Sequence, residues 1–205
     1  MKELITVYAE STPNPSTMKF VASTPFITSG LTVEYFEESE AENSPLSQRL
    51  FSFPFVKSLF LASNFVTVTR NDLVEWDDVV LELREYIQNY LQTGHEVFTK
   101  PPTATQHQRT NEEGTQEFIK MMSEPQDEVE ESIINLLEEY VRPAVEGDGG
   151  AIHFKSFNKE SGELTVKLSG ACSGCPSSTA TLKGGIQNLF NRMMPEVKTV
   201  NAEEV

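Results

Sequence analysis

Apolar and polar residues alternate in short stretches of the first 94 residues. The alternation runs through residues 4–9, 31–36, 56–61 and 65–69, and a period of two is typical of strands with one buried face. The stretch 76–91 instead carries apolar side chains three and four residues apart, which predicts one buried face of a helix. These apolar residues are Val79, Val80, Leu83, Ile87, Tyr90 and Leu91. A shorter helix is predicted to begin at Ser44-Pro45, a cap residue followed by a first-turn proline. Residues 1–94 therefore predict a small α+β domain.

Residues 124–205 predict a second α+β domain with the order helix, strand, strand, helix, strand. The first helix begins at the capping pattern Ser123-Glu124-Pro125-Gln126 and ends at Arg142-Pro143. Its predicted apolar face consists of Val129, Ile133, Leu136, Leu137 and Tyr140.

Two strands, 152–157 and 164–168, follow this helix and form a predicted hairpin. A second helix spans 177–194, with Ser177 or Ser178 as its N-cap, and a last strand spans 197–200. The predicted apolar face of the second helix consists of Leu182, Ile186, Leu189, Phe190 and Met193.

Between these domains, residues 95–123 lose the periodic pattern. The stretch from Lys100 to Asn111 is polar, contains two prolines and offers almost nothing to bury. Such a composition is typical of a flexible linker. A chain of about 30 such residues has a root-mean-square reach of about 30 Å, so the two domains are expected to move relative to one another.

The chain is strongly acidic, with a net charge of −15 over 205 residues. Residues 1–94 and 124–205 each carry −7, and no basic patch stands out in either. Nucleic acids and anionic membrane surfaces are therefore not expected as partners. The sequence has no run of about 18 apolar residues, so no membrane-spanning segment is expected either.

The N-terminal residues show neither a signal-peptide pattern nor an Arg-rich transit peptide. Closely spaced cysteines without an export signal indicate a reducing compartment. The sequence therefore predicts a cytoplasmic protein.

Both cysteines of the chain lie in one short motif, Cys172-Ser173-Gly174-Cys175. Two thiols at this spacing can share a metal ion, share a cluster or form a disulfide. Because a predicted helix begins just after them, the sulfurs are expected near its N-terminus, where unpaired N–H groups favour anions. Small neighbouring residues should leave both thiols reachable. The sequence thus predicts an accessible site with a raised thiolate fraction.

The number of ligands limits the possible metal sites. Zinc and iron–sulfur sites usually need four protein ligands. His95 and His107 lie in the polar stretch, and His153 lies on a predicted strand well before the motif. One chain therefore supplies half a site, and a two-fold dimer could supply the other half.

Four interpretations of Cys172 and Cys175 remain open at this point. They could be an incidental buried pair, a thioredoxin-like dithiol, half of a shared zinc site or half of a shared iron–sulfur site. The dithiol needs a βαβ frame upstream, whereas the sequence predicts a hairpin. Thiolates and a helix N-terminus suit an anionic cluster, which favours the iron–sulfur interpretation.

The cysteine motif also carries a family resemblance. The stretch 168–176, continuing through Thr181-Leu182-Lys183-Gly184-Gly185-Ile186, closely resembles the signature of the NifU C-terminal (Nfu) domain. Arg142-Pro143 and Asp148-Gly149-Gly150 match that domain's other fixed feature. Residues 1–94, with Thr12-Pro13-Asn14-Pro15, the stretch 58–70 and Trp76, are similar to the N-terminal domain that accompanies it in many Nfu proteins.

The resemblance implies an iron–sulfur cluster scaffold or carrier, not an enzyme. Its cofactor would be a [4Fe–4S] cluster, or alternatively [2Fe–2S], shared by a homodimer and ligated by Cys172 and Cys175 of each chain. Its implied partners are upstream assembly proteins and the apo-proteins that receive the cluster. The alternative function is a thiol–disulfide oxidoreductase that uses the same cysteine pair.

Overall fold

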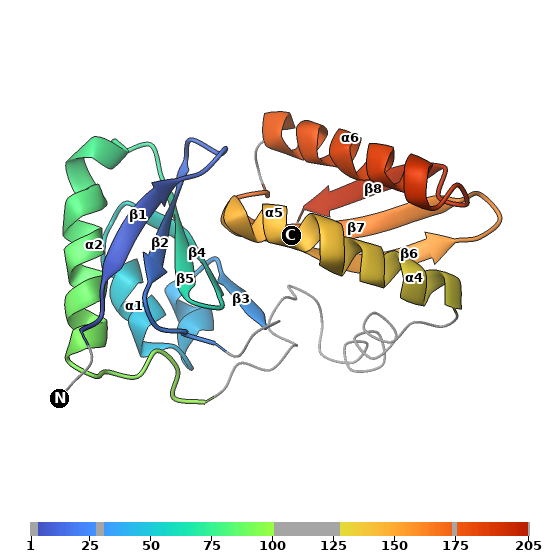
Figure 1. Ribbon diagram of the computed structural model, residues 1–205. Coiled ribbons are helices and arrows are strands. Elements are labelled where there is room, and N and C mark those ends of the chain that lie inside the picture. Colours follow the sequence, from blue (N-terminus) through green and yellow to red (C-terminus); the bar gives the residue numbers. More distant parts are fainter. Residues whose placement is uncertain (1–3, 28–30, 101–127, 174–175, 205) are drawn as a thin grey trace. The chain divides into compact units, whose positions relative to one another are not determined.

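The computed structural model of the chain describes residues 4–27, 31–100, 128–173 and 176–204. The chain divides into two compact units, Met1–His107 and Gln108–Val205. Each unit combines helices with its own sheet (Figure 1), so the predicted α+β fold class is confirmed. No helix in the described ranges is long and apolar enough to cross a membrane.

A five-stranded antiparallel sheet in the order β1-β2-β5-β4-β3 forms the frame of the first unit. Its strands are β1 (Val7–Ser11), β2 (Thr17–Ala22), β3 (Thr32–Tyr35), β4 (Val56–Ala62) and β5 (Phe65–Arg70). Its helices are the short η1 (Glu38–Ala41), α1 (Pro45–Phe51) and α2 (Trp76–Gln92). The four strands and two helices predicted for this region are all present. Strand β2 is an addition that the apolar pattern does not predict.

The core of the first unit lies between the sheet and the two helices α1 and α2. Val79, Leu83 and Ile87 of α2 are buried there, at the positions the helical pattern predicts. Trp76 begins α2, and its indole Nε1–H donates to Pro15 O at 3.1 Å. Ser44 caps α1 by accepting from the Ser47 N–H at 3.3 Å.

Most of the segment predicted as a linker, 95–123, lies outside the described residues. Its first residues are described and contact the first unit. Ser44 Oγ donates to Val97 O at 2.9 Å, and the Thr99 N–H donates to Asn43 O at 2.9 Å. The chain therefore stays packed on the first unit as far as Thr99.

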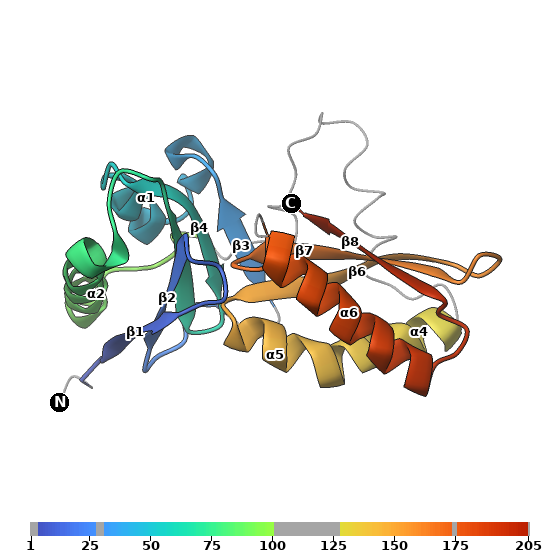
Figure 2. The same ribbon diagram turned by 90° about the horizontal axis from the view of Figure 1, so that it is seen from above.

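The second unit has a three-stranded sheet in the order β6-β7-β8, with helices on one face only (Figure 2). Strands β6 and β7 are antiparallel, and β7 and β8 are parallel. The elements are α4 (Glu128–Leu136), the π-helix η2 (Leu137–Val141), α5 (Arg142–Gly147), β6 (Gly150–Asn158), β7 (Glu163–Gly170), α6 (Pro176–Met193) and β8 (Thr199–Glu204). The predicted order of helix, strand, strand, helix, strand is confirmed.

The prediction that the first helix ends at Arg142-Pro143 is wrong, because a π-helical turn carries it through the proline. The Arg142 N–H donates to Leu137 O, five residues back. This wider turn accommodates a proline that lacks an N–H and would clash with a carbonyl four residues earlier. Tyr140, expected on the apolar face, is half exposed. The buried face instead follows every fourth residue: Ile133, Leu137, Val141 and Val145.

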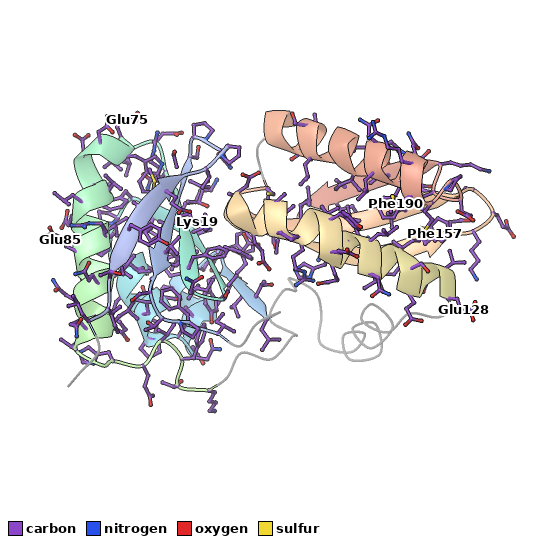
Figure 3. The ribbon with its side chains drawn as sticks, viewed as in Figure 1. Lys19, Glu75, Glu85, Glu128, Phe157 and Phe190 are labelled. Carbon is purple, nitrogen blue, oxygen red and sulfur yellow. The ribbon has the colours of Figure 1, made fainter. Side chains whose placement is uncertain are left out.

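Helix α6 and strand β8 close the core of the second unit. Phe190 of α6 is fully buried, and Phe157 of β6 packs against the same cluster (Figure 3). Met193, which is predicted to lie on the apolar face of the helix, is half exposed, and its neighbour Met194 is buried instead. Helix α6 begins at Pro176, so Ser177 and Ser178 lie inside its first turn and neither is the N-cap.

Candidate metal centre

The cysteine motif lies between the end of β7 and the start of α6. Cys172 sits two residues after the last residue of β7, and α6 starts at Pro176, a residue suited to the first helical position. Cys175 lies outside the described residues. The motif therefore lies where a strand is followed by a helix, as predicted. Of its two thiols, the structure describes that of Cys172.

Hydrogen bonds tie the described part of the loop around Cys172 to its neighbours. The Ala171 N–H donates to Gly149 O at 3.1 Å, and the Ser173 N–H donates to Gly170 O at 3.1 Å. From α6, Thr179 Oγ1 donates to Cys172 O at 3.3 Å. The loop is thus tied both to the turn before β6 and to the first turns of α6.

The turn before β6 packs directly against the cysteine side chain. Gly150 opens β6 opposite Gly170, and a Cβ atom built on Gly150 would lie 2.8 Å from Cys172 Sγ. The same atom would lie 2.6 Å from Ser169 O. No side chain fits in this space, so position 150 needs glycine for close approach. Gly149 before it has a φ of +82°, which glycine adopts at little cost.

Cys172 is buried, with 5% of its surface exposed. Burial in this position raises the pKa of its thiol from an ordinary 9.0 to about 12, and the Asp148 carboxylate adds to the effect. The predicted accessibility and raised thiolate fraction are therefore wrong for Cys172. Loss of hydration and the nearby negative charge of Asp148 both oppose the thiolate.

Asp148 and Gly150 are site residues that the sequence pattern does not single out. The simplest interpretation of Glu146-Gly147-Asp148-Gly149-Gly150 is a turn, and the turn is present, because the Gly149 N–H donates to Glu146 O at 3.1 Å. What the pattern does not reveal is that the turn faces Cys172. The one signal in the sequence is the family resemblance, in which Asp148-Gly149-Gly150 accompanies the cysteine motif.

Histidines do not complete the ligand set in the described part of the chain. The His95 ring packs on Tyr90 in the first unit, with ring centroids 5.1 Å apart, and His153 lies opposite Lys167 in the second. His107 lies outside the described residues. Within the described ranges, no three His, Cys, Asp or Glu residues group so as to hold a metal ion.

Two family models match the chain in order. Residues 7–94 match the model described as scaffold protein Nfu/NifU N terminal, and residues 133–201 match the NifU-like domain. The second match includes the turn at Asp148, both cysteines and helix α6.

Curated relatives align with nearly the whole chain. NifU-like protein 4, mitochondrial, of Arabidopsis thaliana is 35% identical over 96% of this chain, which spans 65% of that protein's length. The human protein named NFU1 iron-sulfur cluster scaffold homolog, mitochondrial, is 34% identical over 95% of this chain and 70% of its own length. A solution structure of a NifU-like protein from Saccharomyces cerevisiae matches with a TM-score of 0.40 and 24% identity, over 47% of this chain and 87% of that one.

The predicted cytoplasmic location is wrong, because these plant and human relatives are both named mitochondrial. That prediction depended on the N-terminal residues and on the cysteine chemistry. The chain spans only part of each relative's length, so its first residues carry no information on targeting.

Proposed function

The chain belongs to the Nfu/NifU-like family of iron–sulfur cluster scaffold proteins, and on that premise we propose that two copies hold one [4Fe–4S] cluster between them and deliver it to apo-proteins. Cys172 and Cys175 of each copy are the proposed ligands. The cluster is cargo, so the chain acts by binding and release and not as an enzyme.

The ligand count carries this proposal. A cubane cluster is normally held by four thiolates, and the chain contains two cysteines. No group of three donors in the described residues offers an alternative site. A two-fold axis through the cluster supplies the two missing thiolates from an identical surface.

Cluster loading requires the Cys172 loop to open. The buried thiol must lose its proton before it can ligate iron, and its pKa of about 12 opposes this as long as the thiol packs on Gly150. Hydrogen bonds of 3.1–3.3 Å tie the described part of the loop to Gly149, to Gly170 and to Thr179 of α6. A loop that opens for loading can also open for release, as a delivery protein needs. We place this activity in mitochondria, following the names of the relatives.

The alternative function, a thiol–disulfide oxidoreductase, needs an attacking thiol whose pKa is depressed. The pKa of Cys172 is raised, so this thiol does not suit that role. Disulfide turnover without iron would be the measurement that supports the alternative.

Anaerobic reconstitution with iron and sulfide tests the proposal. We expect about four irons per two chains and a dimer that depends on the cluster. Two irons per dimer would instead indicate a [2Fe–2S] cluster. Cys172→Ser and Cys175→Ser should each abolish loading, whereas Ser161→Ala, an exposed change in the β6–β7 loop, should not. A monomer that retains stoichiometric metal, or loading that survives Cys172→Ser, would overturn the proposal.

A further inference from the structure

The cysteine loop begins with a turn that closes on itself. The Ser173 N–H donates to Gly170 O at 3.1 Å, and Gly170 has a φ of +67°, in the left-handed region that glycine adopts at little cost. Cys172 lies inside this turn. The position of its side chain therefore depends on how neighbouring elements hold the turn.

Hydrogen bonds join the turn to β6 and to α6. The Ala171 N–H donates to Gly149 O at 3.1 Å, just before the start of β6, and Thr179 Oγ1 of α6 donates to Cys172 O at 3.3 Å. The first bond joins two backbone groups. The second comes from a side chain, so a substitution can remove it and leave the backbone groups of the turn as they are.

The hydroxyl of Thr179 reaches outside its own helix. Thr179 is the fourth residue of α6, which begins at Pro176, and Cys172 O lies seven residues before it. Threonine is less favourable than alanine in a helix, because its branched side chain loses rotamer freedom there. At this position the side chain contacts the residue that supplies a proposed ligand.

The Thr179 bond belongs to the closed position of Cys172. A Cβ built on Gly150 would lie 2.8 Å from Cys172 Sγ and 3.1 Å from Cys172 Cβ, and Cys172 is part of the core cluster of the second unit. Because Cβ packs there as well as Sγ, rotation of the side chain alone does not free the residue. The backbone of Cys172 has to move, and its carbonyl then leaves the Thr179 hydroxyl.

We propose that Thr179 is a positioning residue that holds the empty cysteine turn closed and so favours release of the cluster. Its bond is made in the empty chain and broken in the loaded one, so it stabilises the empty chain alone. An interaction that differs between two states shifts their equilibrium by its own free energy. This proposal rests on the proposed function, because it assigns a role in binding and release at the same site.

The size of the effect follows from the strength of one hydrogen bond. A neutral hydrogen bond of ordinary strength shifts such an equilibrium about fivefold. Each of the two chains that share a cluster has its own Thr179. If the two turns open independently, their effects multiply to about twenty-fivefold in the affinity for the shared ligand.

Three variants isolate the hydroxyl. Thr179→Val removes it, and valine keeps the branched shape and nearly the helix propensity of threonine. Thr179→Ser retains the hydroxyl and is the rescue variant. Thr199→Val is the matched control, because Thr199 is exposed and pairs with Glu163, at the end of β7 opposite to the turn.

Alkylation of Cys172 follows the turn in the cluster-free chain, at constant pH in a Cys175→Ser background. A packed thiol reacts only when the turn opens, so Thr179→Val should react at least about fivefold faster. Thr179→Ser and Thr199→Val should stay within about twofold of the unsubstituted rate. An unchanged rate in Thr179→Val would mean that the thiol is freed without breaking this bond, and it would overturn the proposal.

Titration of the cluster-free chain with cobalt(II) measures the effect on metal affinity. Cobalt bound by thiolates absorbs visible light and binds reversibly, so it reports on the ligand set without cluster assembly. Where two chains share one ion, Thr179→Val should bind cobalt about twenty-fivefold more tightly, and Thr179→Ser should bind it like the unsubstituted chain. A threonine that only stabilises the fold would leave the affinity unchanged or weaken it on removal, and either result would overturn the proposal.

The same titration separates this proposal from the proposed function. About fivefold tighter binding at one ion per chain would support the role of Thr179 and count against a site shared by two chains. If the unsubstituted chain takes up neither cobalt nor a cluster, the proposed function fails, and the alkylation rates alone decide whether Thr179 holds the turn closed.

Discussion

Replacing Gly150 with alanine tests whether Cys172 packs as the structure describes. The added Cβ would lie 2.6 Å from Ser169 O and 2.8 Å from Cys172 Sγ, whereas ordinary contacts begin at 3.4 Å. The neighbours must therefore give way by about 0.6 to 0.8 Å. Ser169 O belongs to the central strand β7 and cannot move easily. The backbone at position 150 must therefore shift away from Ser169 O, and the Cys172 side chain must move as well.

Overpacking of this kind typically costs about 1–3 kcal/mol. For a unit of this size, each kcal/mol lowers the melting temperature by about 4–8 °C. Gly147→Ala is the matched control, because a Cβ at position 147 meets nothing within 4 Å. The control should melt at or slightly above the wild-type temperature, since alanine is favoured over glycine in a helix.

Two measurements follow the effect on cluster-free protein. Calorimetry should show a lowered transition for the second unit, while fluorescence of Trp76, the single tryptophan, should report an unchanged first unit. Alkylation of Cys172 at pH 8 in a Cys175→Ser background should be faster in Gly150→Ala than in Gly147→Ala. If the two glycine variants melt and react alike, Cys172 does not pack on Gly150 in solution and the reasoning is refuted.

Four further changes have expected outcomes. The pKa of Cys172 is raised to about 12 in the folded chain, so the unfolded chain loses the thiol proton first as pH rises. The contribution of this thiol to the free energy of unfolding is fully present below pH 9 and is lost between pH 9 and 12, by up to about 4 kcal/mol. Alkaline unfolding should show this loss, and Cys172→Ala should remove it. Asp148→Asn removes the negative charge that is the smaller of the two causes raising the pKa of Cys172. Alkylation of Cys172 at pH 8 should therefore speed up, by less than about tenfold. Gln187→Ala removes the side-chain oxygen that accepts from the Val200 N–H on the outer strand β8. Exchange of the Val200 amide should therefore accelerate about fivefold or more. Gly184→Ala, where a Cβ meets nothing within 4 Å, should raise the stability of the second unit by about 1 kcal/mol in calorimetry.

Elements with one buried face follow from the sequence because their pattern is local. Helix α2 shows this, with Val79, Leu83 and Ile87 buried as predicted. Strand β2 does not follow from the sequence, because Lys19 is buried although its charge suggests an exposed position. It pairs with Glu10 at 3.3 Å, and its ammonium lies 4.7 Å from the centroid of the Phe65 ring. Such burial depends on residues distant in sequence, so no local pattern predicts it.

The candidate metal centre likewise combines features that are local in the sequence with one that is not. The spacing of Cys172 and Cys175 and the helix after them are local, and the sequence predicts both the motif and the start of α6 within a residue. The contact between Gly150 and Cys172 is not local, because it arises only when β6 and β7 pair in register. The error on thiol accessibility follows from that missed contact, since close packing on Gly150 removes the hydration that would support a thiolate.

If Cys172 ligates a cluster as proposed, burial of its thiol sets an energetic condition on loading. Deprotonating a thiol of pKa about 12 at pH 7 costs about 7 kcal/mol, against about 3 kcal/mol for an ordinary cysteine. Two Cys172 residues in a dimer would therefore add about 8 kcal/mol if the loop stayed closed. Opening the loop breaks at least the hydrogen bonds of Ala171, Ser173 and Thr179, of about 1 kcal/mol each, and it exposes one small side chain. This cost is at least comparable with the extra deprotonation that opening avoids, so the closed, protonated state is favoured without iron and iron binding has to select the open one. Loss of the cluster would then return Cys172 to its protonated, packed position.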